Sequence, residues 1–178
     1  MKRKGPIVVV VFSLLIAVFM AFVSMLPNTV ELESKYQFNH SQEQVVSYLS
    51  TSENWKNWLF YVPKTQMEYI QNGPEKGGGS GFKWFNSQEG DGVLEIKSVL
   101  KNSVIYELVT DDGNFRERGV FIIEGDNTNA LVTWQDTLDV STNLFARWAA
   151  DNEGFTERIN NKNLTTLHKI DSLMNHSN

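Results

Sequence analysis

The fold of this chain is decided by Gly92-Val-Leu-Glu-Ile-Lys-Ser-Val-Leu100 and Ser103-Val-Ile-Tyr-Glu-Leu-Val-Thr110, two runs that only two residues separate. In both runs apolar and polar residues alternate along the chain. A period of two is typical of β-strands that are buried on one face and wet on the other. The sequence therefore predicts neighbouring strands of an antiparallel sheet.

The same alternation continues on both sides of these runs. It predicts further strands at Val30–Phe38, Thr65–Gln71, Gly81–Ser87, Phe115–Glu124 and Ala130–Val140. The breaks between them hold strong turn formers: Gly73-Pro74, Asp111-Asp112-Gly113 and Gly125-Asp126-Asn127. The glycine-rich stretch Gly77–Gly81 is interpreted as another flexible turn rather than a phosphate loop, because it lacks the P-loop lysine and no helix follows it. Together these segments predict an antiparallel meander.

The predicted strands can be sorted into an apolar and a polar face. The apolar face collects Phe82, Trp84, Leu94, Ile96, Val104, Tyr106, Leu108, Phe115, Phe121, Ile123, Val132, Trp134 and Leu138. The polar face collects Lys83, Glu95, Lys97, Glu107, Arg116, Arg118, Thr133 and Gln135. One side of the sheet must therefore be covered, and the C-terminal helix is the only long amphipathic element in the sequence that can cover it.

Helices are predicted before and after the sheet. Ser41 and Gln44 have the spacing of a capping box that starts a short helix, and a second short helix would carry Trp55 and Trp58 on one face. At the C-terminus, a piece at 143–150 is interrupted near 152–154. A longer helix follows, and its apolar side is marked by Phe155, Ile159, Leu164, Leu167, Ile170 and Leu173.

The first thirty residues predict a membrane anchor. Met1 is followed by three basic residues, and the run Ile7–Leu26 has no charge and only Ser13 and Ser24 as polar interruptions. About 20 residues rising about 1.5 Å each would span the roughly 30 Å hydrocarbon core of a bilayer. The basic residues before the run place the N-terminus in the cytoplasm. We therefore expect a single-pass protein of the cytoplasmic membrane, with the remaining chain facing the periplasm or exterior.

A cleaved signal peptide is the alternative interpretation of this segment. Signal peptides have an apolar region of about 7 to 15 residues, followed by a cleavage site in which two small residues are separated by one residue of any type. The apolar run here is longer. No cleavage site is formed either, because the best candidate small residues, Ser24 and Ala21, have Phe22 and Phe19 two positions before them instead of another small residue.

Composition limits which partners and which stabilising bonds the part of the chain after the apolar run can have. The chain has 178 residues, 16 Lys and Arg, 21 Asp and Glu, and no Cys. Without Lys2, Arg3 and Lys4, 13 basic residues face 21 acidic ones, a formal charge of −8. Nucleic acid is therefore an unsuitable partner, since its binding needs a basic face. Disulfides are excluded, and the scattered His40, His168 and His176 predict no metal site and no cofactor.

Short stretches throughout Val30–Leu173 carry a family resemblance. They are Glu53-Asn-Trp-Lys-Asn-Trp58, Gly79-Ser-Gly-Phe-Lys-Trp84, Gly92-Val-Leu-Glu-Ile96 with Val104-Ile-Tyr-Glu-Leu108, Val132-Thr-Trp134, and Asn143-Leu-Phe-Ala-Arg-Trp148. In their order and spacing the chain resembles the START-like superfamily, also called SRPBCC, and in particular bacterial proteins of the polyketide cyclase or dehydrase type. Members with one N-terminal membrane helix also resemble it.

The resemblance implies an α+β helix-grip fold, in which a curved antiparallel sheet wraps around a long C-terminal helix and a hydrophobic cavity lies between them. We expect a stub and anchor at 1–29, a START-like domain at 30–174 and a tail at 175–178. The family shares no catalytic set, so the resemblance implies the cavity more than any reaction.

Two carboxylates interrupt the apolar face of the predicted sheet. If Asp126 and Asn127 form a two-residue hairpin turn, Glu117 faces Asp136 across the strands. Such a pair in an apolar cavity could share a proton and act as an acid–base couple. The alternative is that both carboxylates lie near the rim, in water or paired with Arg147 or Arg158.

Three functional hypotheses follow. The first is a membrane-anchored domain that binds a hydrophobic small molecule or lipid in its cavity, lined by Trp84, Tyr106, Phe121, Trp134 and Phe155, with Trp55 and Trp58 as a lid or as core residues. The second is a cyclase or dehydrase that uses Glu117 or Asp136. The third is a cavity-free envelope module that binds another protein of unknown identity.

Overall fold

A computed structural model describes residues 5–60, 64–88, 90–110, 115–151 and 153–176. The predicted turn at 111–113, the basic residues before the apolar run, Asn152 and the last two residues of the tail lie outside the described residues. The elements in chain order are α1 (Gly5–Ser24), β1 (Thr29–Phe38), α2 (Gln42–Leu49), α3 (Ser52–Trp55), the 3-10 turn η1 (Lys64–Gln66), β2 (Glu68–Asn72), β3 (Gly81–Phe85), β4 (Gly92–Leu100), β5 (Ser103–Thr110), β6 (Phe115–Gly125), β7 (Ala130–Asp139), α4 (Leu144–Ala150) and α5 (Glu153–Asn175).

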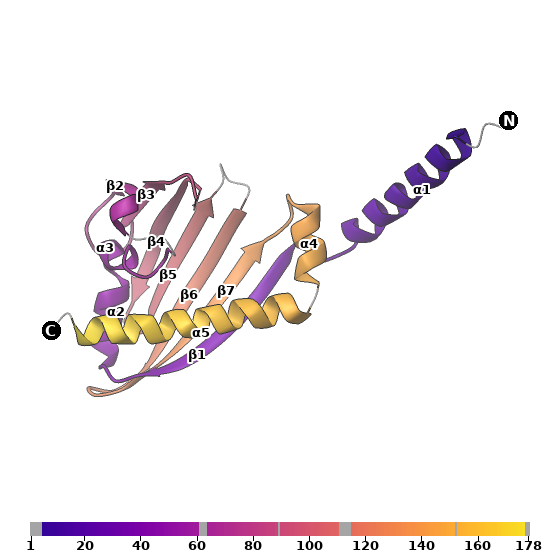
Figure 1. Cartoon of the computed structure of the whole chain (residues 1–178). Helices are drawn as coiled ribbons and strands as arrows, with labels where there is room; N and C mark the ends of the chain where they lie inside the picture. The colour runs from indigo at the N-terminus through magenta and orange to yellow at the C-terminus, as the bar shows by residue number, and fades with distance from the viewer. Residues whose placement is uncertain (1–4, 61–63, 89, 111–114, 152, 177–178) are drawn as a thin grey trace.

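The strands form one seven-stranded antiparallel sheet in the order β1-β7-β6-β5-β4-β3-β2. The predicted meander therefore runs from β2 to β7, and the first strand of the chain joins it at the far edge. Figure 1 shows the long helix α5 running across the sheet from α4 toward α2, while α3 lies beside β3. Helix α5 packs on β1, and α2 packs on β5 and β6.

The predicted apolar face is the core of the domain. The largest fully buried side chains of this core come from the strands and from α2, α3 and α5. They are Trp55, Trp84, Tyr106, Phe38, Phe82, Phe121, Leu49, Leu94, Ile96, Ile123, Leu167 and Ile170. The assignment of Thr133 to the solvent-exposed face is wrong, because this residue is buried. The long alternating strands thus determine which side of the sheet α5 covers.

The helix ends follow the sequence signals in part. Ser41 accepts the Gln44 backbone N–H and Gln44 reaches back to the Ser41 N–H, so the predicted capping box is confirmed. Asn143 caps α4 through the N–H of Ala146. The second short helix, however, ends at Trp55 instead of continuing to Trp58.

The predicted register of the β6–β7 hairpin is wrong by two residues. Glu117 pairs with Leu138, and Gly119 pairs with Asp136. The reason is the turn: the Asp126 side chain accepts the backbone N–H groups of Thr128 and Asn129, and this closes a four-residue loop.

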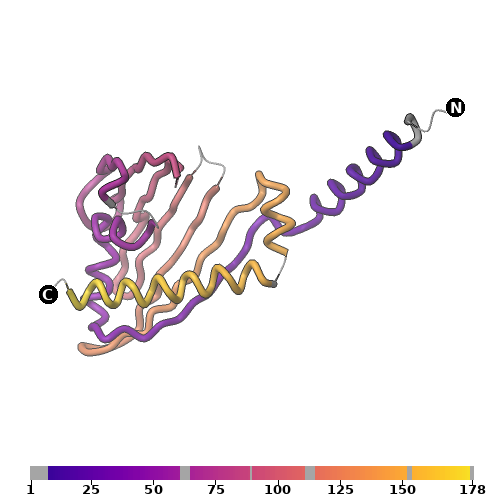
Figure 2. Tube along the Cα trace, in the orientation of Figure 1, coloured from indigo at the N-terminus to yellow at the C-terminus, as the bar shows by residue number. Residues whose placement is uncertain are grey.

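The N-terminal helix α1 extends away from the sheet, and Figure 2 shows the two chain ends on opposite sides of the molecule. The expected transmembrane helix is not found, since no helix within the described residues meets both the length and the hydropathy that a membrane span needs. The end of α1 is held by α4, where the buried Arg147 donates from Nη2 to the carbonyl oxygens of Ser24, at 3.0 Å, and Leu26.

Candidate functional site

The Tyr106 hydroxyl lies at the centre of a buried polar cluster in the apolar face of the sheet. Its oxygen is 2.5 Å from Glu117 Oε1 and 2.6 Å from Asp136 Oδ1. The indole N–H of Trp134 donates to the same oxygen at 2.9 Å. One phenol therefore joins two carboxyl groups, and the Trp134 indole donates a further hydrogen bond to it.

The sheet register explains why these side chains meet. Tyr106 on β5 pairs with Gly119 on β6, which in turn pairs with Asp136 on β7. A Cβ atom at Gly119 would lie 2.3 Å from the Tyr106 ring, so only glycine leaves room for the ring to cross β6. Glu117 lies two residues along β6 on the same face. The phenol thus bridges carboxylates that are not directly paired.

The hydrogen count requires a proton on one of the two carboxyl groups. A tyrosine hydroxyl donates one hydrogen bond and accepts two. The Trp134 N–H uses one acceptor position, and the hydroxyl can donate to only one carboxylate. The other carboxyl lies within hydrogen-bond distance and must donate its own proton to the hydroxyl, because otherwise two oxygen lone pairs would face each other. The cluster therefore carries at most one negative charge.

The electrostatics of the cluster agree with this count. Burial, and after it the charge of Glu117, raises the pKa of Asp136 to about 7. Burial also raises the pKa of Glu117, against the lowering effects of the Tyr106 hydrogen bond and of the Lys162 charge. The pKa of Tyr106 lies well above its usual value, again because of burial, so the phenol stays neutral. The proton shared by the carboxyl groups is retained near neutral pH.

Helix α5 connects this cluster to the surface. The Asn163 amide donates to Asp136 Oδ2 at 2.8 Å, and both residues are buried. The neighbouring Lys162 is exposed and acts electrostatically on Glu117. The carboxyl of Glu117 lies in the interior, yet the residue keeps some exposed surface. The cluster is thus held by the sheet on one side and by α5 on the other.

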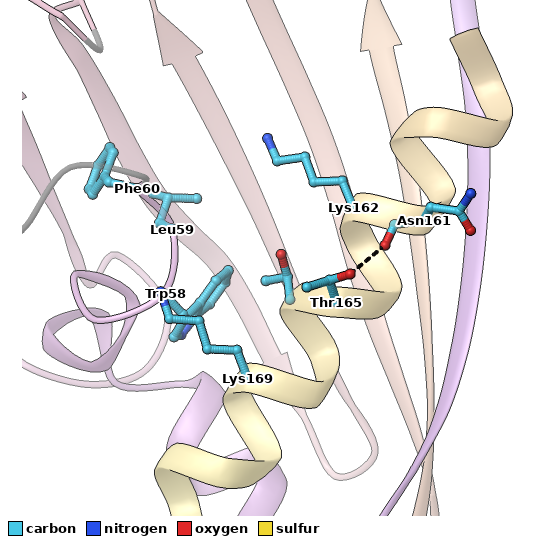
Figure 3. A pocket seen from close by; sticks show the side chains of 8 residues that line it. Trp58, Leu59, Phe60, Asn161, Lys162, Thr165 and Lys169 are labelled. Atoms are coloured by element: carbon cyan, nitrogen blue, oxygen red, sulfur yellow. Dashed lines mark hydrogen bonds between the residues drawn. The ribbon is translucent and has the colours of Figure 1, made fainter. Parts of the chain in front are cut away.

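A groove of about 440 Å³ lies between α5 and the segment Trp58–Phe60. Figure 3 shows its two walls, with aromatic and aliphatic side chains on one side and the polar side chains of α5 on the other. The described residues that line it are Trp58, Leu59, Phe60, Asn161, Lys162, Thr165, Thr166 and Lys169. Its volume falls in the range of about 300 to 1,000 Å³ that is usual for small-molecule sites.

Aromatic contacts join the groove to the polar cluster. The Trp58 ring lies 6.2 Å from the Trp134 ring and 6.4 Å from the Phe121 ring, measured between centroids. Trp55 packs edge-on against Tyr106 at 4.9 Å. One wall of the groove therefore contacts Trp134, which donates to the Tyr106 hydroxyl of the cluster.

The structure brings some of the expected site residues together and separates others. Tyr106 and Trp134 belong to the polar cluster, and the Phe121 ring packs against both. Trp84 lies further along the sheet, beside Phe60. Phe155 is half-buried on α5. Of the two residues expected as lid or core, Trp55 is fully buried, whereas Trp58 is 3% exposed and also lines the groove.

The structure also shows the surroundings of Arg147 and of the histidines. The alternative pairing of the carboxylates with Arg147 is wrong, because Arg147 binds the backbone at the end of α1. Among the described residues no cluster of His, Cys, Asp or Glu could hold a metal ion. The His40 ring instead lies 3.6 Å from the Asp171 carboxylate in the interior.

The sequence interpretation missed Asn163 and the lysines of the groove. Asn163 shares a helix face with the buried Leu167 and Ile170, so a polar residue within an apolar stripe was the available signal. Nothing in the sequence marked Lys162 and Lys169, because exposed lysines on a helix are ordinary.

Comparisons with known proteins show the fold. No family model matches the chain, and no curated protein matches it. A similar solved structure is the protein TTHA0849 from Thermus thermophilus, with a TM-score of 0.58, 12% identity, and coverage of 83% of this chain and 98% of that one. Norcoclaurine synthase from Thalictrum flavum, in complex with dopamine and hydroxybenzaldehyde, matches with a TM-score of 0.55, 10% identity and coverage of 88% and 92%.

Ara h 8.0201 matches with a TM-score of 0.57, 10% identity and coverage of 84% of this chain and 99% of that one. At these identities the likeness concerns the fold alone. Together with the seven-stranded sheet and the long C-terminal helix, it shows that the chain has the helix-grip fold.

The shared proton makes stability depend on pH in a defined direction. The pKa of Asp136 is raised in the folded state above the value of about 3.9 expected in the unfolded chain. The folded state therefore binds this proton more tightly. Its contribution to stability is complete below about pH 4 and is lost as pH rises through about 7.

We expect Asp136→Asn to behave as the protonated form, because its amide can donate to Tyr106 and accept from Asn163. At pH 8 it should be more stable than the wild type by about 1 to 3 kcal/mol, at about 1.4 kcal/mol per pKa unit, with the difference shrinking toward pH 5. Urea unfolding at a series of pH values measures this. The exposed-site control Asp151→Asn should keep the wild-type profile, and a wild type whose stability is flat from pH 5 to 8 would contradict the shared proton.

Proposed function

We propose that this chain is a START-like domain that binds a hydrophobic small molecule or lipid in the groove between Trp58–Phe60 and α5. The observation that carries the proposal is the groove itself, whose volume suits a small ligand and whose one wall is apolar. The helix-grip fold supports it, since the neighbour from Thalictrum flavum was solved with two aromatic small molecules. A protein-binding module without a cavity fits the groove less well.

A second candidate function is acid–base chemistry of the cyclase or dehydrase type. The observation in its favour is that Tyr106 links Glu117 and Asp136 so that one proton is shared between them. Glu117 is the candidate base because it keeps exposed surface, whereas Asp136 is a positioning residue buried behind the phenol. A raised pKa suits a group that takes up and returns a proton, and burial raises the pKa of both carboxyl groups, that of Asp136 to about 7.

We also propose that α1 tethers the domain to the cytoplasmic membrane, with the N-terminus inside and the domain facing the periplasm or exterior. Helix α1 contains no charged residue, and its large apolar side chains from Val8 to Phe22 are exposed, mostly by 40% to 67%. Burying such surface in hydrocarbon is strongly favourable. The basic residues before α1 support this orientation.

Binding in the groove can be tested with the neutral fluorescent probe N-phenyl-1-naphthylamine. We expect its emission to rise on binding to the wild type, and Thr166→Trp to weaken the affinity at least about tenfold, because the indole fills the groove. The control Ser172→Trp places the same side chain in the neighbouring groove beside Tyr36 and Leu173. Equal weakening by both variants, or no binding by the wild type, would argue against this site.

The acid–base candidate can be tested with 2-tetralone in D₂O. The Glu117 carboxylate would remove a proton from the carbon beside the carbonyl, the C–H electron pair would move toward the carbonyl oxygen, and deuterium would return to the carbon. We expect NMR to show exchange about 100-fold above buffer, a typical size for general-base catalysis. Glu117→Gln should abolish the excess, while the control Glu95→Gln, on the wet face of the sheet, keeps it. Exchange at the buffer rate would rule out this chemistry.

Membrane tethering and orientation can be tested in one experiment because the chain has no cysteine. The full chain carrying Asn127→Cys, in the exposed β6–β7 loop, should sediment with membranes and react with an impermeant maleimide in intact spheroplasts. Lys2→Cys should react only after lysis. Recovery of the chain in the soluble fraction, or the opposite labelling pattern, would contradict the proposal.

A further inference from the structure

We propose that the ligand of the groove is an acidic amphiphile, whose carboxylate or phosphate group is held by Lys162 and Lys169 while its apolar body lies against Trp58, Leu59 and Phe60. This inference rests on the proposed binding function, because it assigns the chemistry of the molecule that occupies the same groove.

The two lysines are placed to act together. They lie seven residues apart on α5, which is close to two full turns, so they share one face of the helix about 10 Å apart along its axis. Thr165 and Thr166 lie between them and also line the groove. Figure 3 shows both lysine side chains extending from α5 toward the wall of Trp58 and Leu59. Both lysines thus belong to the lining that also contains Trp58 and Leu59.

The charge of the groove is opposite in sign to that of the chain. Its described lining contains two cations and no acidic residue, although the chain carries a net charge of −5. Lys162 acts electrostatically on the carboxylate of Glu117, and Glu117 is not among the lining residues. Lys169, about two turns further along α5, extends the positive character of this wall. An anion is therefore favoured here over a neutral or cationic group.

The shape of the lining favours an amphiphile over a simple anion. Leu59 and Phe60 are half-buried, so their exposed parts give this wall apolar contact area, and the almost completely buried Trp58 supports them from behind. The lysines and threonines come from α5, which forms the second wall. An apolar body gains from leaving water on the first wall, and an anionic end gains from charge-assisted hydrogen bonds on the second.

The test displaces N-phenyl-1-naphthylamine from the purified protein with probes that share a twelve-carbon chain, each below its micelle concentration. The probes are dodecanoate, dodecyl phosphate, 1-dodecanol and dodecyltrimethylammonium, with inorganic phosphate as a separate arm. We expect the two anions to bind at least about tenfold more tightly than the alcohol, and this preference to shrink between about 20 and 300 mM NaCl. Which of the two anions binds more tightly then tells a fatty acid from a phosphate-bearing lipid.

Variants assign the preference to the two lysines. In the double variant Lys162→Gln and Lys169→Gln the anion preference should fall to less than about threefold, while the affinity for dodecanol and the naphthylamine stays the same. The matched control Lys83→Gln and Lys101→Gln, on an exposed strand and turn, should keep the full preference. Thermal melts followed by circular dichroism show whether all variants fold.

Each other outcome has a defined meaning. Equal affinity for dodecanol and dodecanoate, or tightest binding of dodecyltrimethylammonium, would overturn the acidic amphiphile and leave the binding function intact. Displacement by inorganic phosphate alone, at the concentrations at which the amphiphiles act, would also overturn it, because the apolar body would then contribute nothing. No binding of any probe, the naphthylamine included, would instead overturn the proposed function.

Discussion

The sharing of one phenol hydroxyl by two carboxyl groups constrains the centre of this structure. The Tyr106 hydroxyl on β5 reaches Glu117 on β6 and Asp136 on β7. Asn163 on α5 donates a hydrogen bond to the same Asp136 carboxyl group. A buried carboxylate without such partners would cost several kcal/mol. Gly119, which the phenol must cross, and Trp134, which donates to it, follow from this arrangement. The hydrogen bond between Asn163 and Asp136 thus helps to hold α5 on the sheet, next to the groove.

Much of the fold could be predicted because period-two alternation is strong in this sequence. The bounds of β4 and β5 agree with the prediction, and the capping box at Ser41 starts α2 as expected. The β6–β7 register could not be predicted, since it depends on whether the Asp126 side chain closes a two-residue or a four-residue turn. The pairing of Glu117 with Asp136 was therefore wrong in register, yet the two carboxyl groups are joined through the Tyr106 hydroxyl, which lies within hydrogen-bond distance of both.

The groove itself could not be predicted from the sequence. Period and composition indicate that a helix covers the sheet, but the space between them depends on where the chain leaves α3 and how far α5 stands from it. Trp58, expected as lid or core, is buried and also lines the groove, because α3 ends at Trp55 and Trp58 lies beyond the helix. The lysines gain significance only from the aromatic wall opposite them. Their location, rather than their residue type, suggests the chemistry of the ligand.

Mapping by ¹H–¹⁵N NMR tests the central claim, that the groove between Trp58–Phe60 and α5 is the binding site, most directly. On titration with dodecanoate, the account predicts that the largest shifts occur at the backbone amides of 58–60 and 161–169 and at the Trp58 indole N–H. Smaller shifts should reach the Trp134 indole, which touches both Trp58 and the cluster. Shifts confined to the groove beside Tyr36 and Leu173, or no shifts at saturating dodecanoate, would contradict it.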